Sequence, residues 1–295
     1  MRGGFFTALL AASAAVCADG ETWRVPSWDA RLTASGFLKS SSFHVQGMCA
    51  ASNALYFTMY DGLYKTDWMG RPLNRADAPK HTGDVCLWKG WLYTACCADR
   101  GDQSADKGRI RVYDEELNFI RERSFSRPAD GITCVDGVLY VGLGPGGTKE
   151  APYRGNWYGK FDAETLEPLC EPFRVDHGHD CCAGVQNMAT DGKLLYVSVY
   201  TPDEAAHEPS FIVFDRSFNV VAMHEFGWRQ GLDVVPGGDG DAVRFIYATT
   251  VNWMNRPWND EEAPPSQALW QFAELKDGRI RDITRHCIYR KPWAR

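Results

Sequence analysis

The stretch Gly83-Asp84-Val85-Cys86 opens the unit that decides the fold class. It is followed by Leu92-Tyr93 inside a β-rich run, by a strand that ends in Tyr113-Asp114, and by a turn that leads to Phe119-Ile120-Arg121-Glu122. Short runs of β-forming residues between turns predict antiparallel strands, and no helical periodicity separates these runs. One unit therefore predicts four strands in succession.

The unit recurs along the chain. Its Leu-Tyr or Ile-Tyr pair returns at intervals of 37 to 56 residues, at Tyr56, Tyr93, Tyr140, Tyr196 and Tyr247. In four units an aromatic residue and an Asp end the third strand, at Phe161-Asp162, Phe214-Asp215, Tyr113-Asp114 and, with two residues inserted, Tyr64 to Asp67. A single four-stranded unit cannot bury both of its faces, so the units must pack around an axis. We expect an all-β propeller of five four-stranded blades, with six blades as the alternative.

The propeller is expected to occupy residues 44–295 as one domain, preceded by two short segments. Residues 1–18 have the pattern of a secretory signal, with Arg2 before an apolar run and Val16-Cys17-Ala18 as the cleavage site. Cys17 leaves a lipoprotein open as an alternative. Residues 19–43 are an N-terminal extension or a closing strand. The sequence thus predicts a secreted or periplasmic monomer.

Composition narrows the possible partners. Of the 295 residues, 44% are hydrophobic and 24% are charged, as in an ordinary packed protein. The formal net charge of -6 gives no electrostatic attraction for a nucleic acid backbone. The apolar run from Phe5 to Val16 is too short to span a bilayer. We expect neither a nucleic acid partner nor a membrane span.

The chain resembles the superfamily of secreted and periplasmic propellers with YVTN, NHL or SMP-30-like repeats, over residues 44–287. The motifs that carry the resemblance are the Leu-Tyr pairs and the aromatic-Asp turns. These motifs are structural, and the superfamily includes lactonases, lyases, hydrolases and binding modules. The resemblance therefore implies a fold and no particular activity.

Polar side chains recur where each first strand begins, which predicts a ring around the axis. The ring supplies candidate catalytic residues, since His and Asp serve as general acids and bases. These are His44, His81, Asp84, Asp130 and Asp233. The ring also supplies candidate ligand-binding residues at Gln46, Gln186, Asn187 and Gln230, together with His177, His179 and Asp180. The alternative is that such residues cap strand ends.

Long loops between second and third strands should lie on the same face as this ring. Tryptophans beside Arg and Asn suit stacking on a sugar ring and hydrogen bonding to its hydroxyl groups. The candidate ligand-binding residues there are Arg154, Trp157, Trp253, Arg256 and Trp258. A solvated rim of packed tryptophans is the alternative.

A divalent metal is a possible cofactor. His44, His81 and Gln186 could hold Mn²⁺ or Ca²⁺, as some propeller lyases do. The run Asp176 to Cys182 contains every ligand type that Zn²⁺ favours.

The cysteines are of two kinds. Cys49, Cys86 and Cys134 are expected to be buried free thiols. The adjacent pairs Cys96-Cys97 and Cys181-Cys182 are expected to form vicinal disulfides or cross-links between loops.

Two functions remain open. The first is a carbohydrate-active enzyme with an axial polar pocket. It would be a hydrolase that uses two of Asp84, Asp130 and Asp233, or a lyase in which His44 or His81 takes a proton while Arg154, Arg256 or a metal neutralises a uronic carboxylate. The second is a non-catalytic propeller that binds a glycan or a protein. We expect a small polar ligand or a glycan as partner, and the second function leaves a protein partner open.

Overall fold

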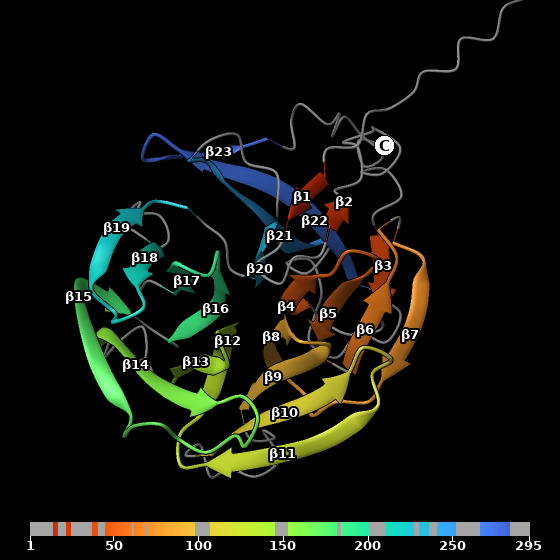
Figure 1. Cartoon of the computed structure of the whole chain (residues 1–295), viewed down its shortest axis with the longest axis horizontal. Helices are drawn as coiled ribbons and strands as arrows, with labels where there is room; N and C mark the ends of the chain where they lie inside the picture. The colour runs from red at the N-terminus through yellow and green to blue at the C-terminus, as the bar shows by residue number, and fades with distance from the viewer. Residues whose placement is uncertain are drawn as a thin grey trace, which may run out of the picture.

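The computed structural model describes residues 14–16, 22–24, 37–40, 45–60, 62–68, 70–97, 107–144, 153–181, 184–200, 210–226, 230–235, 241–251 and 266–283. Five antiparallel sheets surround one axis in this part of the chain, so the protein is a five-bladed β-propeller (Figure 1). The prediction of five blades is confirmed. Within the described residues there is no helix with the length and hydropathy that crossing a bilayer would need.

Each blade has four consecutive strands. Blade 1 contains β4 (Val45–Ala50), β5 (Leu55–Met59), β6 (Gly62–Thr66) and β7 (Pro72–Ala76). Blade 2 contains β8 (Thr82–Trp88), β9 (Trp91–Cys97), β10 (Gly108–Asp114) and β11 (Phe119–Phe125). Blade 3 contains β12 (Ala129–Val135), β13 (Val138–Leu143), β14 (Tyr153–Asp162) and β15 (Phe173–Cys181). Blade 4 contains β16 (Val185–Thr190), β17 (Leu194–Val199), β18 (Phe211–Asp215) and β19 (Val220–His224).

Blade 5 joins the two ends of the ring. It contains β20 (Gln230–Val235), β21 (Val243–Val251), β22 (Ser266–Lys276) and β23 (Arg279–Asp282). The N-terminal strand β3 (Phe37–Ser40) also pairs with β22, at residues 266–269. The chain therefore passes from the sheet of blade 5 directly into blade 1, which ties the ring closed. A separate pair, β1 (Ala14–Val16) and β2 (Thr22–Arg24), spans the predicted cleavage position.

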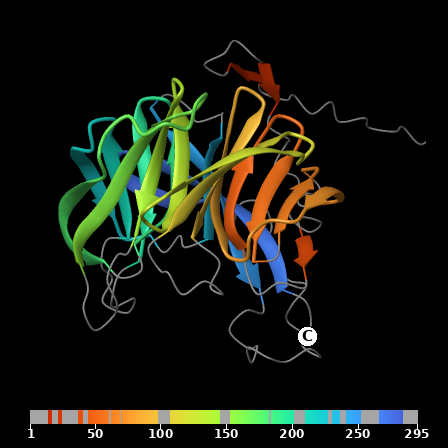
Figure 2. The ribbon, with the colours of Figure 1, turned by 90° about the horizontal axis from the view of Figure 1, so that it is seen from below.

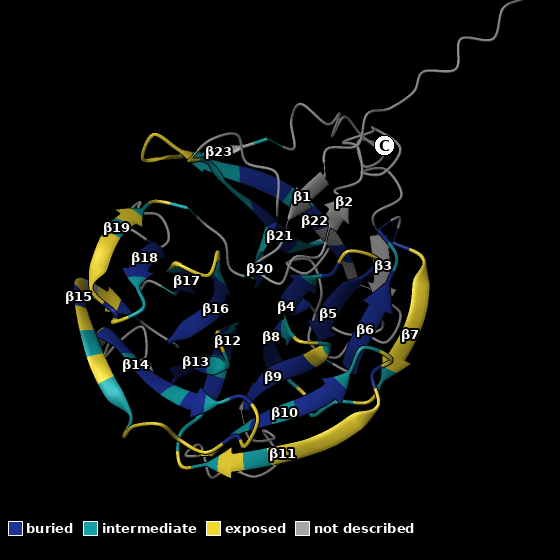
Figure 3. Cartoon of the chain, viewed as in Figure 1, coloured by how far each residue is buried: buried dark blue, intermediate teal, exposed yellow. Residues whose placement is uncertain are grey.

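Burial of the strands decreases from the axis of the disc to its rim. The first strands β4, β8, β12, β16 and β20 surround the axis, and the outer strands β7, β11 and β19 are largely exposed (Figure 3). Seen from the side, the strands run between the two faces of the disc (Figure 2). One hydrophobic cluster fills each of the five interfaces between neighbouring blades. Packing between blades, and not within one blade, buries the apolar surface.

The repeated tyrosines join neighbouring blades. Tyr56 of blade 1 donates its hydroxyl to the carbonyl oxygen of Glu115 in blade 2, at 3.3 Å. Tyr93 of blade 2 donates in the same way to Ala163 of blade 3, at 3.1 Å. The rings of both tyrosines lie in the clusters between the blades that they join. The tyrosines of blades 1 and 2 therefore bind each blade to the next, whereas the Tyr196 hydroxyl donates to Asp191 of its own blade at 3.0 Å.

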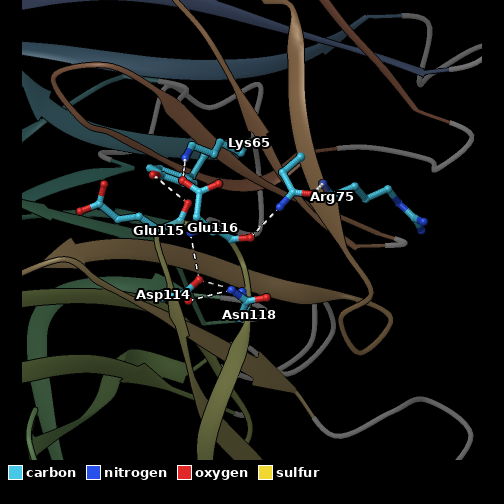
Figure 4. Close-up of polar contacts among 8 residues, drawn as sticks. Lys65, Arg75, Asp114, Glu115, Glu116 and Asn118 are labelled. Carbon is cyan, nitrogen blue, oxygen red and sulfur yellow. Dashed lines mark hydrogen bonds and ion pairs between the residues drawn. The ribbon is translucent and has the colours of Figure 1, made fainter.

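The repeated Asp residues shape the turns that follow the third strands. Asp114 Oδ1 accepts hydrogen bonds from the N–H groups of Glu116 and Asn118, at 2.9 and 2.8 Å. The Asn118 side chain donates to the other oxygen and lowers the pKa of Asp114. Figure 4 shows this turn against blade 1, where Lys65 Nζ lies 2.6 Å from Glu116 Oε1. The turn is thus both closed by its own Asp and bonded to the preceding blade.

An apolar residue with positive φ completes three of these turns. Leu117, Leu166 and Phe218 have φ values of 67°, 61° and 66°. This backbone conformation turns each side chain back into the cluster shared with the preceding blade. Phe218 makes the closest ring contact, with its centroid 4.4 Å from that of Tyr158. The strain of a positive φ is offset by burial of the side chain.

Candidate functional site: the axis and its mouth

The five first strands begin on one face of the disc, which we call the mouth face. Contacts between neighbouring first strands show this, because Gly47 packs against Asp84 and Gly83 packs against Asp130, all near the starts of their strands. Each first strand also has a register shift near its start. A shift of this kind interrupts the alternation of side chains and can direct a polar residue to the axis.

Asp84 lies on the axis and is completely buried. Its Oδ2 accepts the N–H of Met188 in blade 4 at 2.8 Å and the N–H of Ile132 in blade 3 at 3.3 Å. Burial raises the pKa of Asp84 well above its ordinary value, although these N–H groups lower it. One carboxyl group of blade 2 therefore joins two other blades, one of them across the axis.

Asn187 of blade 4 makes the complementary connections. Its Nδ2 donates to the carbonyl oxygen of Gln46 in blade 1 at 2.9 Å, and its Oδ1 accepts the N–H of Gly231 in blade 5 at 2.9 Å. Beside it, Gln186 Nε2 donates to Gln46 Oε1 at 3.4 Å. All four side chains, which we call the axial cluster, are at most 3% exposed: Gln46, Asp84, Gln186 and Asn187. Their hydrogen bonds cross the axis and close it at this depth.

Glycines let the first strands approach this closely. A Cβ on Gly47 would lie 2.5 Å from Asp84 Cα and 2.7 Å from its Oδ1. A Cβ on Gly83 would lie 2.7 Å from the backbone oxygen and the Oδ1 of Asp130. Neither distance leaves room for a side chain. The glycines that lead the strands are therefore required by packing at the axis.

Three predicted site residues lie at the mouth and are partly exposed: His81, Asp130 and Gln230. Asp130 packs over Gly83 of the neighbouring blade. Gln230 Oε1 accepts the hydroxyl of Thr250 at 2.7 Å, and that hydroxyl accepts the N–H of Val45 at 3.0 Å. The structure thus brings polar groups of blades 2, 3 and 5 to the same end of the axis, above the axial cluster.

His81 has an unusual backbone. Its φ is 64°, and its N–H donates to the carbonyl oxygen of Tyr60 at 3.1 Å. The rings of His81 and Tyr60 meet edge to face at 5.9 Å. The other six described non-glycine residues with positive φ lie in hairpin turns within one blade, whereas His81 lies in the connection from blade 1 to blade 2. His81 is the third residue of a β-turn that the Thr82 N–H closes by donating to the Pro79 carbonyl oxygen at 3.1 Å, and this turn accounts for its positive φ.

Asp233 lies away from the mouth. Its Oδ2 accepts the N–H of Ala50 at 2.8 Å, at the opposite end of β4. Burial raises its pKa to about 7, against the lowering effect of the N–H groups of Ala50 and Val234. Of the three carboxylates considered for hydrolysis, Asp84 is therefore within the axial cluster, Asp233 is at the far end, and Asp130 is at the mouth.

Arg154 and Trp157 lie on the outer part of blade 3. Arg154 is exposed and pairs with Asp176 at 3.0 Å. The Arg127 guanidinium lies 3.9 Å from the centroid of the Trp157 ring, which also packs against the cluster between blades 2 and 3. A sugar that stacked on this indole would have to displace Arg127. The other predicted positions, His44, Trp253, Arg256 and Trp258, lie outside the described residues.

Some predictions for the cysteines are confirmed and others are wrong. Cys49 and Cys86 are free and buried, and Cys134 is free but only partly buried. Neither Cys96 nor Cys181 is part of a disulfide, so the prediction that they form disulfides is wrong. The physical reason is their surroundings. Cys96 Sγ packs 3.5 Å from the Thr82 hydroxyl, and Cys181 Sγ lies 3.5 Å from Nε2 of His177, both in the interior.

Sequence reasoning missed two features. One is Thr250, which links Gln230 to blade 1 and comes from a second strand. The other is Tyr158, which is buried beside Asn156 and Cys181. The spacing of Asn156 and Tyr158 was a usable signal for this second feature, because residues two apart share one face of a strand.

No family model matches the chain, and no curated protein matches it in sequence. Solved structures do match its fold. One is the glutaminyl cyclase of Myxococcus xanthus, with 10% identity, a TM-score of 0.53, and coverage of 81% of this chain and 95% of that one. Another is a GH43_1 enzyme from Xanthomonas citri complexed with xylose, with 12% identity, a TM-score of 0.51, and coverage of 86% and 96%.

A third similar structure is a protein of unknown function from Bacteroides thetaiotaomicron, with 10% identity and a TM-score of 0.50. It covers 84% of this chain, which spans only 60% of its length. At these identities the likeness shows the fold alone. The comparisons therefore show that the chain shares its fold with these structures and show nothing more.

Proposed function

We propose that this propeller binds a small polar ligand, of the glycan class, at the mouth of its axis. The observation that carries the proposal is the position of His81, Asp130 and Gln230, which come from three blades and remain partly exposed above a closed axial cluster. Convergent polar groups at the end of a propeller axis suit recognition of hydroxyl groups. The floor of the site is the axial cluster, and the ligand approaches from the mouth face.

The arrangement favours binding over hydrolysis by two carboxylates. Such hydrolysis needs two carboxyl groups about 5 to 9.5 Å apart on either side of the substrate. Asp84 has no exposed surface, and Asp233 bonds to Ala50 at the other end of the strand. Asp130 is the remaining member of the predicted set. Asp84 is better explained as a residue that holds three first strands together than as an acid or base.

A second candidate is a lyase in which His81 takes a proton from a carbon next to a uronic carboxylate. The observation that favours it is the position of His81, an imidazole that is partly exposed at the mouth. Proton abstraction also needs a single base, so it does not require a pair of carboxylates. Arg154 pairs with Asp176 on the outside of blade 3, and the neutralising cation would come from another part of the mouth.

Binding to a panel of neutral and uronic-acid oligosaccharides tests the proposal. Calorimetry of the best hit should show that Asp130→Asn and His81→Asn weaken affinity at least tenfold, about 1.4 kcal/mol. Asp277→Asn is the control, because Asp277 is exposed in the turn between β22 and β23 and Asn accepts its φ of 52°. Equal losses in all three variants, or no loss in any, would place the site elsewhere. Release of an unsaturated product would favour the lyase.

Export through residues 1–18 is part of the proposal. It is supported by Arg2 and the apolar run that follows it. The chain should be recovered from the periplasm or medium with Asp19 as its first residue, as mass spectrometry of the intact protein would show. Recovery with residues 1–18 still attached would oppose it.

A further inference from the structure

The outer strand of blade 4, β19, has one open edge at the rim of the disc. The strand order in its sheet is β16-β17-β18-β19, so β19 pairs with β18 on one side and with no other described strand on the other (Figure 1). Backbone N–H and C=O groups along such an edge can pair with a further strand. Whether an edge invites this pairing depends on its side chains.

The outer strands of the other four blades carry side chains that oppose pairing. Charged residues and proline at a sheet edge discourage the addition of a strand. They are Pro72 and Arg75 in β7, Arg121, Glu122 and Arg123 in β11, Arg174, Asp176 and Asp180 in β15, and Arg279, Arg281 and Asp282 in β23. Strand β19 has the sequence Val-Val-Ala-Met-His and contains no proline, acidic residue, lysine or arginine. Its edge is therefore unprotected.

Apolar side chains are exposed on this strand. Of the eight large hydrophobic residues that are exposed in the described part of the chain, three lie on β19: Val220, Val221 and Met223. Burial lowers the pKa of His224, the last residue of the strand, so the strand is uncharged near pH 7. An uncharged, apolar edge on the rim suits contact with another protein surface.

A bulge near the start of the strand does not set β19 apart. The registers of β7, β11 and β19 each contain one extra residue at the second position, at Leu73, Ile120 and Val221. These three side chains are 54%, 42% and 56% exposed. The difference lies after the bulge, where β11 continues with Arg-Glu-Arg and β19 continues with Ala-Met-His.

The ends of β19 carry opposite charges. Arg216 lies in the turn before the strand and pairs with Asp136 of blade 3 at 2.8 Å. Glu225 is exposed just after the strand, and it shares a face with Met223, two residues earlier. Met223 pairs with Ile212, whose side chain packs in the cluster between blades 3 and 4. Both charges therefore lie on the side of the blade that faces blade 3.

This arrangement is complementary to a second copy of itself. When two identical strands pair antiparallel about a two-fold axis, the start of each lies beside the end of the other and the two sheets present the same face. Glu225 of one copy then approaches the turn that holds Arg216 of the other, at both ends of the pair. The apolar side chains between these ends cover one another.

We propose that two copies of this chain pair through β19, so that their fourth blades join into one continuous sheet. A contact of this length buries less than the about 1,600 Å² of a standard interface, so the dimer exchanges with monomer at micromolar concentration. The dimer would replace the monomer that the sequence led us to expect. The proposal is independent of the ligand proposed at the mouth.

Analytical ultracentrifugation of the full chain over the micromolar range tests the proposal. We expect the wild type to pass from monomer to dimer as its concentration rises, and Val221→Lys to dimerise at least tenfold more weakly, because it adds a charge to each edge. Ile120→Lys is the matched control, since Ile120 is exposed at the same bulge position of β11. Both variants should melt within a few degrees of the wild type. A wild type that stays monomeric, or equal dimerisation of the two variants, would overturn the proposal.

Two further measurements identify the surface that pairs. Glu225→Arg places like charges together at both ends and should weaken the dimer, and the addition of Arg216→Glu should restore it. Hydrogen exchange of the wild type should slow at the β19 amides as concentration rises and stay constant at β11. A double variant no tighter than Glu225→Arg, or β19 exchange that is independent of concentration, would overturn the proposal. So would a monomer whose β19 is protected only by an added apolar peptide, because the edge would then serve a different partner.

Discussion

Asp84 Oδ2 accepts the backbone N–H of Met188 at 2.8 Å, and this bond joins the first strands of two blades that are not neighbours in the ring. The same oxygen accepts the N–H of Ile132 from the blade between them. Most contacts in a propeller join one blade to the next. Asp84 and Asn187 instead bridge the centre, so the ring depends on side chains as well as on the pairing of β3 with β22.

Loss of the Asp84 carboxyl should therefore destabilise the fold. Asp84→Ala leaves the N–H groups of Ile132 and Met188 buried without an acceptor, and we expect a loss of about 3 to 5 kcal/mol in the free energy of unfolding. Asp84→Asn retains one acceptor and should lose less. Urea denaturation followed by tryptophan fluorescence measures both, with Asp241→Ala on the exposed surface as the control. Similar stability of Asp84→Ala and the control would exclude the bridging role.

The close approach at Gly47 gives a second prediction. In Gly47→Ala the new Cβ would overlap Asp84, at 2.5 Å from its Cα, so a strand of the axis must move. We expect a loss of about 3 kcal/mol or more, or no folded protein. Gly144→Ala is the control, since its Cβ would meet Pro128 at an ordinary 3.4 Å. Thermal melts of the two variants should differ by well over 5 °C.

The fold could be predicted because its signals are local and repeated. The Tyr56 and Tyr93 hydroxyls repeat one contact in blades 1 and 2, and the Asp114 and Asp215 carboxylates repeat another in blades 2 and 4. Such repetition makes these contacts visible in a sequence. A blade count follows from them without knowledge of long-range packing.

The site could be predicted only in part, because bulges decide where its side chains lie. Asp84 follows Gly83 and enters the axial cluster, whereas Asp130 precedes Gly131 and stays at the mouth. One position along the strand separates these outcomes, and a register shift cannot be recognised from residue types. The pairing of His177 with Cys181 depends on a bulge of the same kind.

The raised pKa of Asp233 predicts an unusual dependence of stability on pH. Its pKa is about 7 when folded and about 3.9 when unfolded, so the folded state binds the proton more tightly between these values. The contribution of Asp233 to the free energy of unfolding therefore falls as pH rises from about 4 to about 7. The free energy of unfolding of Asp233→Asn minus that of the wild type should rise over this window, by about 1 to 2 kcal/mol, and level off above it.

Urea denaturation at several pH values between 4 and 8.5 measures this difference for Asp233→Asn. Asp241→Asn provides a surface control whose difference from the wild type should stay flat. A flat difference for Asp233→Asn as well would show that its carboxyl is hydrated in the folded state and titrates normally.

Substitution of Phe218 tests whether the apolar residues at positive φ stabilise the interfaces between blades. Its ring contacts those of Tyr158, Phe173 and Phe214, at 4.4, 5.2 and 5.5 Å between centroids. Phe218→Ala opens a cavity between blades 3 and 4 and keeps the backbone strain, so we expect a loss of about 3 to 5 kcal/mol. Phe119→Ala, at a residue 52% exposed on β11, should cost less than about 1 kcal/mol in the same denaturation experiment. Equal losses would contradict the role of Phe218 at the interface.

Substitution of His81 distinguishes a role in stability from a role in ligand binding. Glycine adopts a φ of 64° without steric cost, so His81→Gly removes the backbone strain together with the imidazole. If the histidine is retained for ligand recognition, this variant should unfold within about 1 kcal/mol of the wild type and bind the oligosaccharide hit at least tenfold more weakly. Asp277→Gly makes the same backbone change in a hairpin turn and should alter neither affinity nor stability by more than that amount. If His81→Gly instead loses several kcal/mol of stability, the contact of His81 with Tyr60 is structural. If the variant keeps full affinity for the oligosaccharide, His81 is not part of the binding site.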